Sequence, residues 1–249
     1  MSQDRRKAIV TGAASGIGAA TMVELARRGF DVACLDLNGA GGEATVRAAT
    51  AEGGRHSSFV VDVADEPALV KVFAAALGQL GGLDALATAA GVGEMTPFMD
   101  LDAATFRRVY DVNVVGTFLC LREAAKVMPR GARICTVASV AGIRGGGLTG
   151  TAAYAASKGG VLALTKNAAR ALADRGIDVN TIAPGATLTP MIAEPWKNEV
   201  HRKRVEAMAL QNRTGAPDEI ARAIAFLLSA DASFVSGATL VADGGLAMF

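Results

Sequence analysis

The stretch "TGAASGIG", residues 11–18, decides the fold of this chain. It follows a short β-branched run, "KAIVT" (7–11), and leads into "AATMVELARRG" (19–29), whose apolar residues recur at helical spacing. The pattern therefore predicts a strand, a tight turn and a helix. Glycines in such a turn allow positive φ and close approach of the backbone to a ligand, while the first turn of the helix offers free N–H groups to an anion.

The glycines of this turn are spaced Gly-x-x-x-Gly-x-Gly, which differs from the G-x-G-x-x-G pattern of the better-known dinucleotide fingerprint. An ordinary glycine-rich turn is the alternative. We interpret the turn as a loop that holds the pyrophosphate of a dinucleotide, because it lies at the first strand-to-helix junction and an acidic residue follows at the right distance. The loop residues expected to contact this cofactor are Gly12, Ser15, Gly16, Ile17 and Gly18.

The acidic residue is Asp36, which ends the second apolar run, "DVACLD" (31–36). A carboxylate at the tip of the second strand accepts hydrogen bonds from the ribose hydroxyls of adenosine and repels a 2′-phosphate. Leu37 and Asn38 supply no cation directly after it. The sequence thus favours NAD over NADP, and the alternative is a carboxylate that only caps a helix or a turn.

Tyr154 and Lys158, in "YAASKGG" (154–160), lie four residues apart on one face of a predicted helix. A phenol ordinarily titrates near ~10, and a neighbouring ammonium lowers the pKa of the phenol by favouring the phenolate. Tyr154 is therefore a candidate proton donor and acceptor. Alone, the pair is also compatible with a solvated helix face.

Together these motifs make the chain resemble the short-chain dehydrogenase/reductase family over essentially its whole length. The segments that carry the resemblance, in the order of the family, are "TGAASGIG" (11–18), Asp36, "DV" (62–63), "DVNVVGTF" (111–118), "VASVAG" (137–142), "YAASK" (154–158) and "APG" (183–185). The resemblance implies an oxidoreductase that binds a nicotinamide dinucleotide.

Four side chains become catalytic candidates through this resemblance. It implies Tyr154 as general acid/base, and Lys158 as the partner that lowers the pKa of Tyr154 and holds the nicotinamide ribose. It also implies that Ser139 orients the substrate oxygen and that Asn113 holds a water linking Lys158 to solvent. The chemistry agrees, because two hydroxyl donors stabilise the alkoxide character that develops on oxygen during hydride transfer to a carbonyl. Taken singly, Ser139 and Asn113 are more often structural.

The resemblance extends to further cofactor contacts and has one departure. The other residues expected to contact the cofactor, besides Tyr154 and Lys158, are Asp62, Val63, Gly91, Pro184, Gly185, Thr187 and Thr189. Of the two threonines, Thr189 matches the family pattern better. Where the family commonly reads "NNAG" after its fourth strand, this chain has "TAAG" (88–91), so a side-chain amide is missing at Ala89.

Two segments are expected to shape the substrate site. Residues 186–214 interrupt the alternation of strands and helices, and we interpret them as a lid; a surface helix with scattered apolar residues is the alternative. The glycines at 145–147 indicate a flexible wall beside the reacting centre, where a surface loop is the alternative. The residues expected to contact substrate are Ser139, Arg144, Met191 and Trp196. Arg144 would pair with an anionic substrate group, unless it is simply solvated.

Length, charge and composition bound the class of protein. We expect one domain (1–249), and the formal net charge of +1 argues against nucleic acid as a partner. No apolar run is long enough to cross a membrane, no secretory signal is evident, and three cysteines inside apolar runs suit a reduced, cytoplasmic protein. His56 and His201 lie far apart without a ligand cluster, so we expect no catalytic metal.

Strand-like and helix-like runs alternate along the chain. The pattern predicts an α/β, Rossmann-like doubly wound parallel sheet with helices on both faces. Strands are expected near 7–11, 32–36, 57–61, 83–88, 132–137, 177–182 and 238–242, and helices near 17–28, 40–52, 66–80, 103–127, 153–174 and 217–229. Two of these helices, 103–127 and 153–174, are apolar on more than one face, which indicates burial, here by a second subunit. The resemblance implies a homotetramer.

Three functions compete on this evidence. The leading hypothesis is that the protein interconverts a secondary alcohol and a ketone with NAD, with Tyr154 as acid/base. The substrate would then be a small molecule. The second is an NADPH-dependent 3-oxoacyl-thioester reductase, which the motifs permit and Asp36 argues against. The third is a non-catalytic dinucleotide-binding module, which the presence of all four catalytic candidates disfavours, although the fold alone does not discriminate.

Overall fold

A single parallel sheet organises the computed structural model, which describes residues 5–146 and 152–248. Within these residues seven strands pair in the order β3-β2-β1-β4-β5-β6-β7. The strands are β1 (Arg6–Thr11), β2 (Phe30–Asp36), β3 (His56–Val60), β4 (Ala85–Thr88), β5 (Arg133–Val137), β6 (Asp178–Pro184) and β7 (Thr239–Ala242). The predicted Rossmann-like doubly wound sheet is confirmed.

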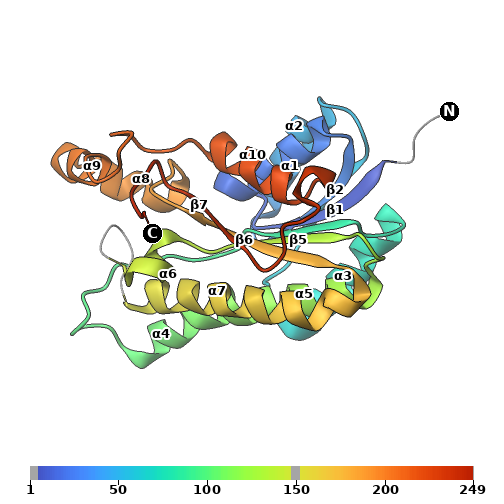
Figure 1. Cartoon of the computed structure of the whole chain (residues 1–249), viewed down its shortest axis with the longest axis horizontal. Helices are drawn as coiled ribbons and strands as arrows, with labels where there is room; N and C mark the ends of the chain where they lie inside the picture. The colour runs from blue at the N-terminus through green and yellow to red at the C-terminus, as the bar shows by residue number, and fades with distance from the viewer. Residues whose placement is uncertain (1–4, 147–151, 249) are drawn as a thin grey trace.

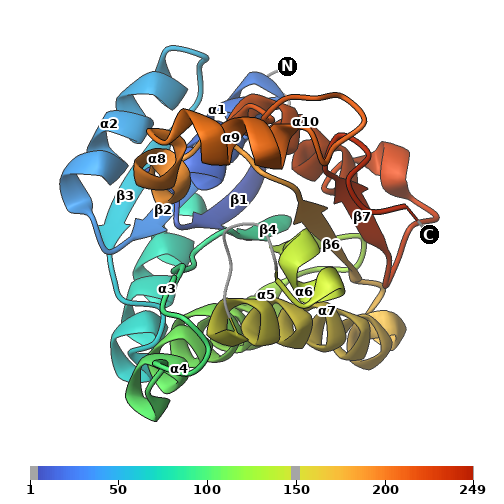
Figure 2. The same ribbon diagram turned by 90° about the vertical axis from the view of Figure 1, so that its left-hand side faces the viewer.

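Helices cover both faces of this sheet (Figures 1 and 2). One face carries α1 (Gly16–Arg27), α2 (Gly39–Thr50) and α10 (Pro217–Leu227), and the other carries α3 (Glu66–Leu80), α5 (Gly116–Val127) and α7 (Ala152–Leu172). The shorter helices are α4 (Ala103–Tyr110), α6 (Val140–Arg144), α8 (Pro190–Trp196) and α9 (Glu199–Glu206). In Figure 1, α6, α8 and α9 lie together at one end of the sheet.

Two hydrophobic cores lie on the two faces of the sheet, because successive side chains of a strand point to opposite faces. In β1, Ile9 belongs to the core beneath α3 and α5, while Ala8 and Val10 belong to the core beneath α1 and α10. Strands buried on both faces read as continuous apolar runs, which is why the central strands show no polar alternation. Helix α1 contributes Met22 and Leu25 from one stripe of its surface.

The strand order reverses beside β1, and this reversal positions the site. The chain runs outward from β1 to β2 and β3, and then returns to the other side of β1 as β4. The loops that follow β1 and β4 therefore leave the sheet side by side at its carboxyl edge. Ligands of open α/β sheets bind in the crevice at such a point.

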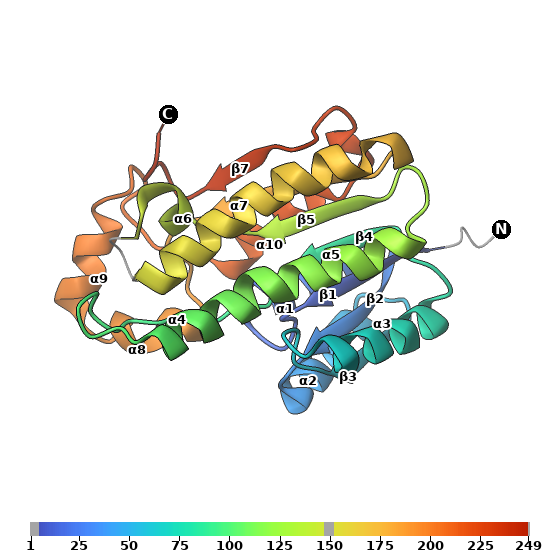
Figure 3. The ribbon, with the colours of Figure 1, turned by 90° about the horizontal axis from the view of Figure 1, so that it is seen from below.

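The helix expected over 103–127 is divided in the structure. A wide π-type turn, Asp111–Val115, joins α4 to α5, so the two form one rod alongside α7 (Figure 3). Asn113 lies in the middle of this turn and is fully buried. Short π-type turns inside α-helices frequently mark functional sites, and the spacing of apolar residues did not reveal this one.

Two further findings concern the three cysteines and the lengths of the helices. Cys34, Cys120 and Cys135 are buried as free thiols, and burial raises the pKa of Cys34 to about 11 and that of the other two to about 12. Such thiols are poorly reactive. In the described part of the chain, no helix is both long and apolar enough to span a bilayer.

Substitution of Gly18 tests how tightly the start of α1 packs on the glycine-rich loop. A Cβ at Gly18 would lie 2.1 Å from Gly12 O, whereas a Cβ at Gly78 in α3 would meet nothing within 4 Å. We expect Gly18→Ala to lower the free energy of unfolding by several kcal/mol, because backbone must move. Gly78→Ala, the matched control, should raise it by about 0.5–1 kcal/mol, since alanine favours the helix. Urea unfolding measures both, and a Gly18→Ala protein as stable as the wild type would contradict the packing.

Candidate active site

A cleft of about 470 Å³ opens at the carboxyl edge of the sheet, where the strand order reverses. It brings together most of the residues that the sequence placed in a site. These are Gly12, Ser15, Gly16, Ile17, Gly18, Asp36, Asp62, Val63, Gly91, Ser139, Tyr154, Lys158, Pro184, Gly185, Thr187, Thr189 and Met191. Asn113, Arg144 and Trp196 do not line it.

The glycine-rich loop forms the floor of this cleft. Gly12 and Gly16 adopt left-handed φ values of 67° and 54°, which glycine tolerates best. A Cβ at Gly12 would lie 2.5 Å from Ala90 N, so the loop after β1 touches the loop after β4. Helix α1 begins at Gly16, and Ser15 makes no capping hydrogen bond through its side chain. The N–H groups of this helix end are therefore available to an anion in the cleft.

Asp36 lies at the end of β2, half-buried in the cleft wall. Its Oδ2 accepts a hydrogen bond from Ala14 N at 2.9 Å, and its Oδ1 accepts one from Asn38 N at 2.8 Å. The side chain of Asn38 in turn caps α2 by accepting from Gly41 N at 3.1 Å. Both carboxylate oxygens keep lone pairs that can accept further hydrogen bonds.

Tyr154 and Ser139 form a pair of hydroxyls in the cleft. They come from the start of α7 and from the residue that caps α6, and their side chains hydrogen-bond to each other. Removal of the phenol from water raises the pKa of Tyr154 above its ordinary value, and the hydrogen bond from Ser139 opposes this rise. A phenol with a hydroxyl neighbour can donate a proton to, or accept one from, an oxygen held between them.

Lys158 lies one helical turn after Tyr154 and is buried. Its Nζ donates to Val137 O at 2.8 Å and lies 5.7 Å from the centre of the Tyr154 ring. Burial lowers the pKa of Lys158 to about 8. The expectation that Lys158 lowers the pKa of Tyr154 is not met in this structure, because burial dominates the phenol and the ammonium is not among the causes of its shift.

Asn113 acts from behind the cleft wall. Its Oδ1 accepts from Val92 N at 2.8 Å, and its Nδ2 donates to Val92 O at 3.0 Å and to Ser157 Oγ at 2.9 Å. Ser157 Oγ also donates to the backbone oxygen of Tyr154 at 2.8 Å. Asn113 thus connects the loop after β4 with the turn of α7 that carries Tyr154. Ser157 is fully buried and was missed by the sequence analysis, although it lies inside the "YAASK" motif.

The same network accounts for the presence of glycine at position 91. A Cβ at this position would lie 3.1 Å from Asn113 Oδ1 and 3.4 Å from Lys158 Nζ. Its neighbours Ala89 and Ala90 line the cleft and carry no amide. Here Thr11 holds the loop instead, because its backbone oxygen accepts from Ala89 N at 3.1 Å and its Oγ1 accepts from Ala90 N at 3.3 Å.

The lid has a small hydrophobic core of its own, made by Ile192, Trp196 and Val205. Trp196 is buried in this core and does not line the cleft. Its Nε1 donates to Thr214 Oγ1 at 2.9 Å, and Thr214 Oγ1 donates to Glu206 Oε1 at 2.7 Å. The structure therefore gives Trp196 a place in the lid's packing, and Ile192, which was not singled out, lines the cleft.

A narrow neck connects the lid to the sheet. Thr187 and Gly215 form an isolated parallel bridge, in which Leu188 N donates to Gly215 O and Gly215 N donates to Ala186 O, both at 2.9 Å. Gln211 N also donates to Gly244 O at 3.0 Å, so a second hydrogen bond ties the end of this segment to the loop after β7. Helices α8 and α9 lie beyond the bridge.

Two contacts place the lid over the cleft. A Cβ at Gly16 would lie 3.1 Å from Thr189 Cγ2, so Thr189 packs on the glycine-rich loop. A Cβ at Gly93 would lie 3.3 Å from Met191 Cγ, so Met191 packs on the loop after β4. Both glycines provide the room for these side chains.

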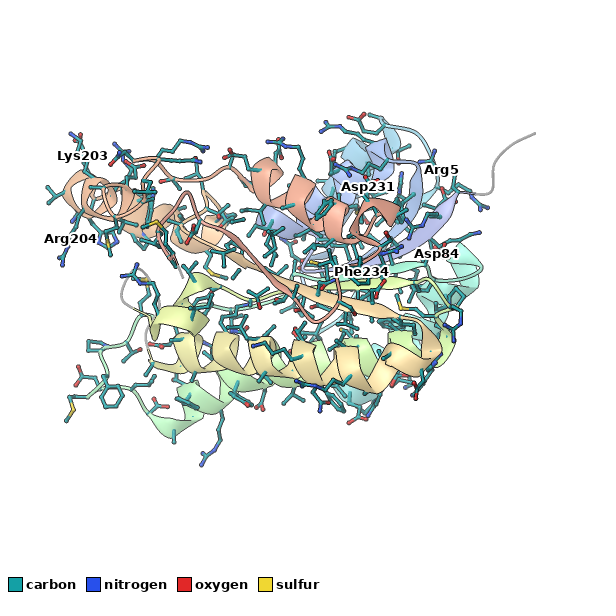
Figure 4. All side chains as sticks on the ribbon, viewed as in Figure 1. Arg5, Asp84, Lys203, Arg204, Asp231 and Phe234 are labelled. Carbon is teal, nitrogen blue, oxygen red and sulfur yellow. The ribbon has the colours of Figure 1, made fainter. Side chains whose placement is uncertain are left out.

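Basic side chains are scarce in the cleft. Arg144 ends α6 and is exposed away from the lining, while Lys203 and Arg204 point outward from α9 (Figure 4). Among the described residues, the basic ones that line the cleft are Lys158 and Arg108. Arg108 was missed by the sequence analysis because no motif marks it.

A second hollow of about 600 Å³ adjoins Tyr154 on the side of Arg108 and Met191. Glu94, which is buried, also lines it, and one of its oxygens accepts from Thr96 N. The wall expected at 145–147 is described only in part. Gly145 and Gly146 follow α6, and Gly147 lies outside the described residues.

No cluster of three or more histidine, cysteine, aspartate or glutamate side chains able to hold a metal ion occurs among residues 5–146 and 152–248. The polar groups that line the cleft include a free helix terminus, the carboxylates of Asp36 and Asp62, several hydroxyls with those of Ser139 and Tyr154 among them, and the cations Lys158 and Arg108. This donor set suits a phosphorylated organic ligand and proton transfer.

Burial of Lys158 makes stability depend on pH in a defined direction. Its pKa falls from 10.5 to about 8 on folding, so between these values the unfolded chain holds a proton that the folded chain has lost. The free energy of unfolding of the wild type, relative to that of Lys158→Met, should therefore rise with pH across this window by about 3 kcal/mol. Urea unfolding of both proteins at either end of the window measures this, and a flat difference would show that the ammonium is not desolvated.

Comparison with known proteins shows the family to which the chain belongs. The family model described as enoyl-(acyl carrier protein) reductase matches residues 12–247. A cis-4-hydroxycyclohexanecarboxylate dehydrogenase of Sinomonas cyclohexanicum is 40% identical over 244 residues, which cover 96% of each chain. A short-chain dehydrogenase/reductase of Armillaria gallica is 38% identical over 253 residues, covering 97% of this chain and 95% of the relative.

A solved structure agrees with the fold as well. The crystal structure of a levodione reductase superposes with a TM-score of 0.90 at 36% sequence identity, and the match covers 97% of each chain. A family-model match over nearly the whole chain and relatives of this identity are decisive for membership. The chain belongs to the short-chain dehydrogenase/reductase family of oxidoreductases.

Proposed function

We propose that this protein interconverts a secondary alcohol and a ketone with NAD as the cofactor. The observation that carries the proposal is the meeting, in one cleft, of the Ser139–Tyr154 hydroxyl pair and a buried lysine with a glycine-rich loop and Asp36. The first group of residues handles protons, and the second suits a dinucleotide.

The residues present fit this cofactor. The free N–H groups at the start of α1 suit the pyrophosphate, and the left-handed Gly12 and Gly16 allow the backbone to approach it. Asp36 suits the hydroxyls of the adenosine ribose. When bound, NAD accepts a hydride from the carbon that bears the alcohol.

The chain's own residues manage the proton that leaves the alcohol. In oxidation, the hydroxyl proton of the substrate passes to the oxygen of Tyr154 in its phenolate form, which becomes a neutral phenol, as the C–H electron pair leaves as hydride to NAD and a ketone forms. Ser139 donates a hydrogen bond to the same substrate oxygen and stabilises its alkoxide character. Asn113 and Ser157 keep the Tyr154 turn in place. Lys158 holds the ribose end of the cofactor and carries the charge next to the phenol.

Named relatives point to a class of substrate. Two of them are a cis-4-hydroxycyclohexanecarboxylate dehydrogenase and a 2,5-dichloro-2,5-cyclohexadiene-1,4-diol dehydrogenase of Sphingobium indicum, 38% identical over 250 residues. Another is a D-threitol dehydrogenase of Mycolicibacterium smegmatis, 36% identical over 244 residues. We propose a compact secondary alcohol that carries a second oxygen-containing group. Met191 and Ile192 supply the apolar side of its site.

The thioester reductase remains the second candidate, and the description of the matching family model is the observation that favours it. Asp36 opposes its NADPH requirement, because a carboxylate repels the 2′-phosphate. A non-catalytic role has no comparable support. We also propose a cytoplasmic homotetramer, supported by the exposed apolar side chains Val115 and Phe118 on the rod formed by α4 and α5.

Replacement of Tyr154 by phenylalanine tests the proposed chemistry. With NAD and a panel of cyclic and acyclic secondary alcohols at alkaline pH, NADH formation should fall by about 100-fold or more, because the proton acceptor is gone. Binding of NADH, followed by its fluorescence, should persist. Tyr110, the other tyrosine of the chain, lies outside the cleft, and Tyr110→Phe is the matched control with retained turnover. Full activity in Tyr154→Phe would refute the assignment.

Cofactor preference separates the two enzymatic candidates. A carboxylate beside a 2′-phosphate costs several kcal/mol, so we expect kcat/KM for NAD to exceed that for NADP by about 100-fold or more. Initial rates measured with NAD and with NADP, over the same range of concentrations and at one fixed substrate concentration, give the two kcat/KM values. A preference for NADP would remove the basis for the proposed role of Asp36 and favour the thioester reductase.

A further inference from the structure

Asp36 holds two loops at once. Its two carboxylate oxygens accept backbone N–H groups from opposite sides, from Ala14 in the glycine-rich loop and from Asn38 in the turn that leads to α2. The Ala14 contact spans 22 positions of sequence and measures 2.9 Å. Hydrogen bonds from an N–H group to an ionised carboxylate are among the stronger ones in proteins.

The glycine-rich loop has few other attachments. Across residues 13–15, in the described part of the chain, Ala14 N is the backbone donor that meets a protein acceptor. The preceding Gly12 N donates to Leu35 O at 2.8 Å, which fixes the start of the loop. Two glycines with left-handed φ add conformational freedom at positions 12 and 16. The carboxylate of Asp36 therefore supplies the hold on the middle of the loop.

Packing confirms that the loop and the turn are built as one unit. A Cβ at Gly41 would lie 2.9 Å from both Ala14 Cβ and Ala14 O, so only glycine fits between the loop and the start of α2. Asn38 caps the same helix through Gly41 N. The position of Ala14 is thus set from one side by contact and from the other by the Asp36 hydrogen bond.

We propose that Asp36 is a positioning residue for the phosphate-binding loop, in addition to its proposed contact with the ribose hydroxyls. Its carboxylate keeps the loop in the shape that receives a pyrophosphate before any nucleotide arrives. Two carboxylate oxygens offer about four acceptor sites, so the same group can hold Ala14 and accept a ribose hydroxyl. Cofactor choice and loop geometry are then coupled in one side chain.

This coupling has a consequence for changes of cofactor preference. Removing the carboxylate relieves the repulsion of a 2′-phosphate. It also removes the hydrogen bond to Ala14 N that positions the loop for the pyrophosphate, which NAD and NADP share. A substitution at Asp36 alone therefore weakens both cofactors, and NADP gains only when another acceptor holds Ala14 N.

The first arm of the test uses the free protein. Hydrogen exchange of the Ala14 amide is measured by NMR in the wild type, in Asp36→Ala and in Asp36→Asn, whose side-chain oxygen still accepts one N–H group. We expect exchange to be about tenfold faster or more in Asp36→Ala, and intermediate in Asp36→Asn. Asp62→Ala is the matched control, because Asp62 is a second acidic residue of the cleft that holds only its own turn through Ala64 N. Unchanged exchange in Asp36→Ala overturns the proposal.

The second arm uses 2′,3′-dideoxyadenosine diphosphate, which has the phosphates but no ribose hydroxyls for Asp36 to contact. Calorimetry should show weaker binding to Asp36→Ala by about tenfold. If Asp36 served only to recognise hydroxyls, loss of its negative charge would leave binding of this anion unchanged or strengthen it, and that result overturns the proposal. A thermal melt of each variant identifies any that fails to fold, and Asp36→Asn then carries the comparison.

The two arms keep this inference separate from the proposed function, on which only the second arm rests. Should the wild type bind no dinucleotide, the proposed function fails, while amide exchange in the free protein still decides whether Asp36 anchors the loop. Should NAD bind and turn over while exchange is insensitive to Asp36, the anchor fails and the function stands.

Discussion

The near-contact between the loop after β1 and the loop after β4 is the constraint on which the site depends. Parallel neighbours in the middle of the sheet deliver both loops to one place, and a missing side chain at Gly12 lets the backbones meet there, since a Cβ would lie 2.5 Å from Ala90 N. Everything that a cofactor would touch is arranged around this floor. The helix terminus of α1 lies on one side of it, and Gly91 with the Asn113 network lies on the other. The hydroxyls of Ser139 and Tyr154 line the same cleft and so have a fixed position relative to this floor.

Burial shifts the pKa values of two side chains behind this floor. Lys158 is an ammonium in a poorly hydrated place, held by Val137 O, and its lowered pKa expresses the cost of that position. Burial shifts the pKa of Tyr154 in the opposite direction, upward, since it disfavours the charged phenolate. Residues whose pKa values are shifted in this way cluster at functional sites.

The fold and most of the cleft could be predicted from the sequence, because each depends on local patterns: β-branched runs, helical spacing, and short motifs such as "TGAASGIG" and "YAASK". What escaped prediction depends on tertiary contacts. The π-type turn holds Asn113 in a hydrogen-bond network with Val92 and Ser157 that the spacing of apolar residues does not encode. Trp196 is apolar and lies in the lid, yet whether it faces the cleft or the lid's interior is decided by the short core it shares with Val205. The missing side-chain amide at Ala89 was visible in the sequence, whereas the hydrogen bonds from Ala89 N and Ala90 N to Thr11 were not.

Residues 186–214 have a small hydrophobic core of their own, and the bridge between Thr187 and Gly215 and the hydrogen bond from Gln211 N to Gly244 O join them to the rest of the chain. Because Trp196 packs inward with its own partners, the exposed positions of α9 are free to vary without disturbing the sheet, whereas Met191 and Ile192 of α8 line the cleft beside Tyr154. On the proposal that this cleft receives an alcohol, evolution can change which molecules fit by altering a few side chains of α8, while the glycine-rich loop and the hydroxyl pair keep their places.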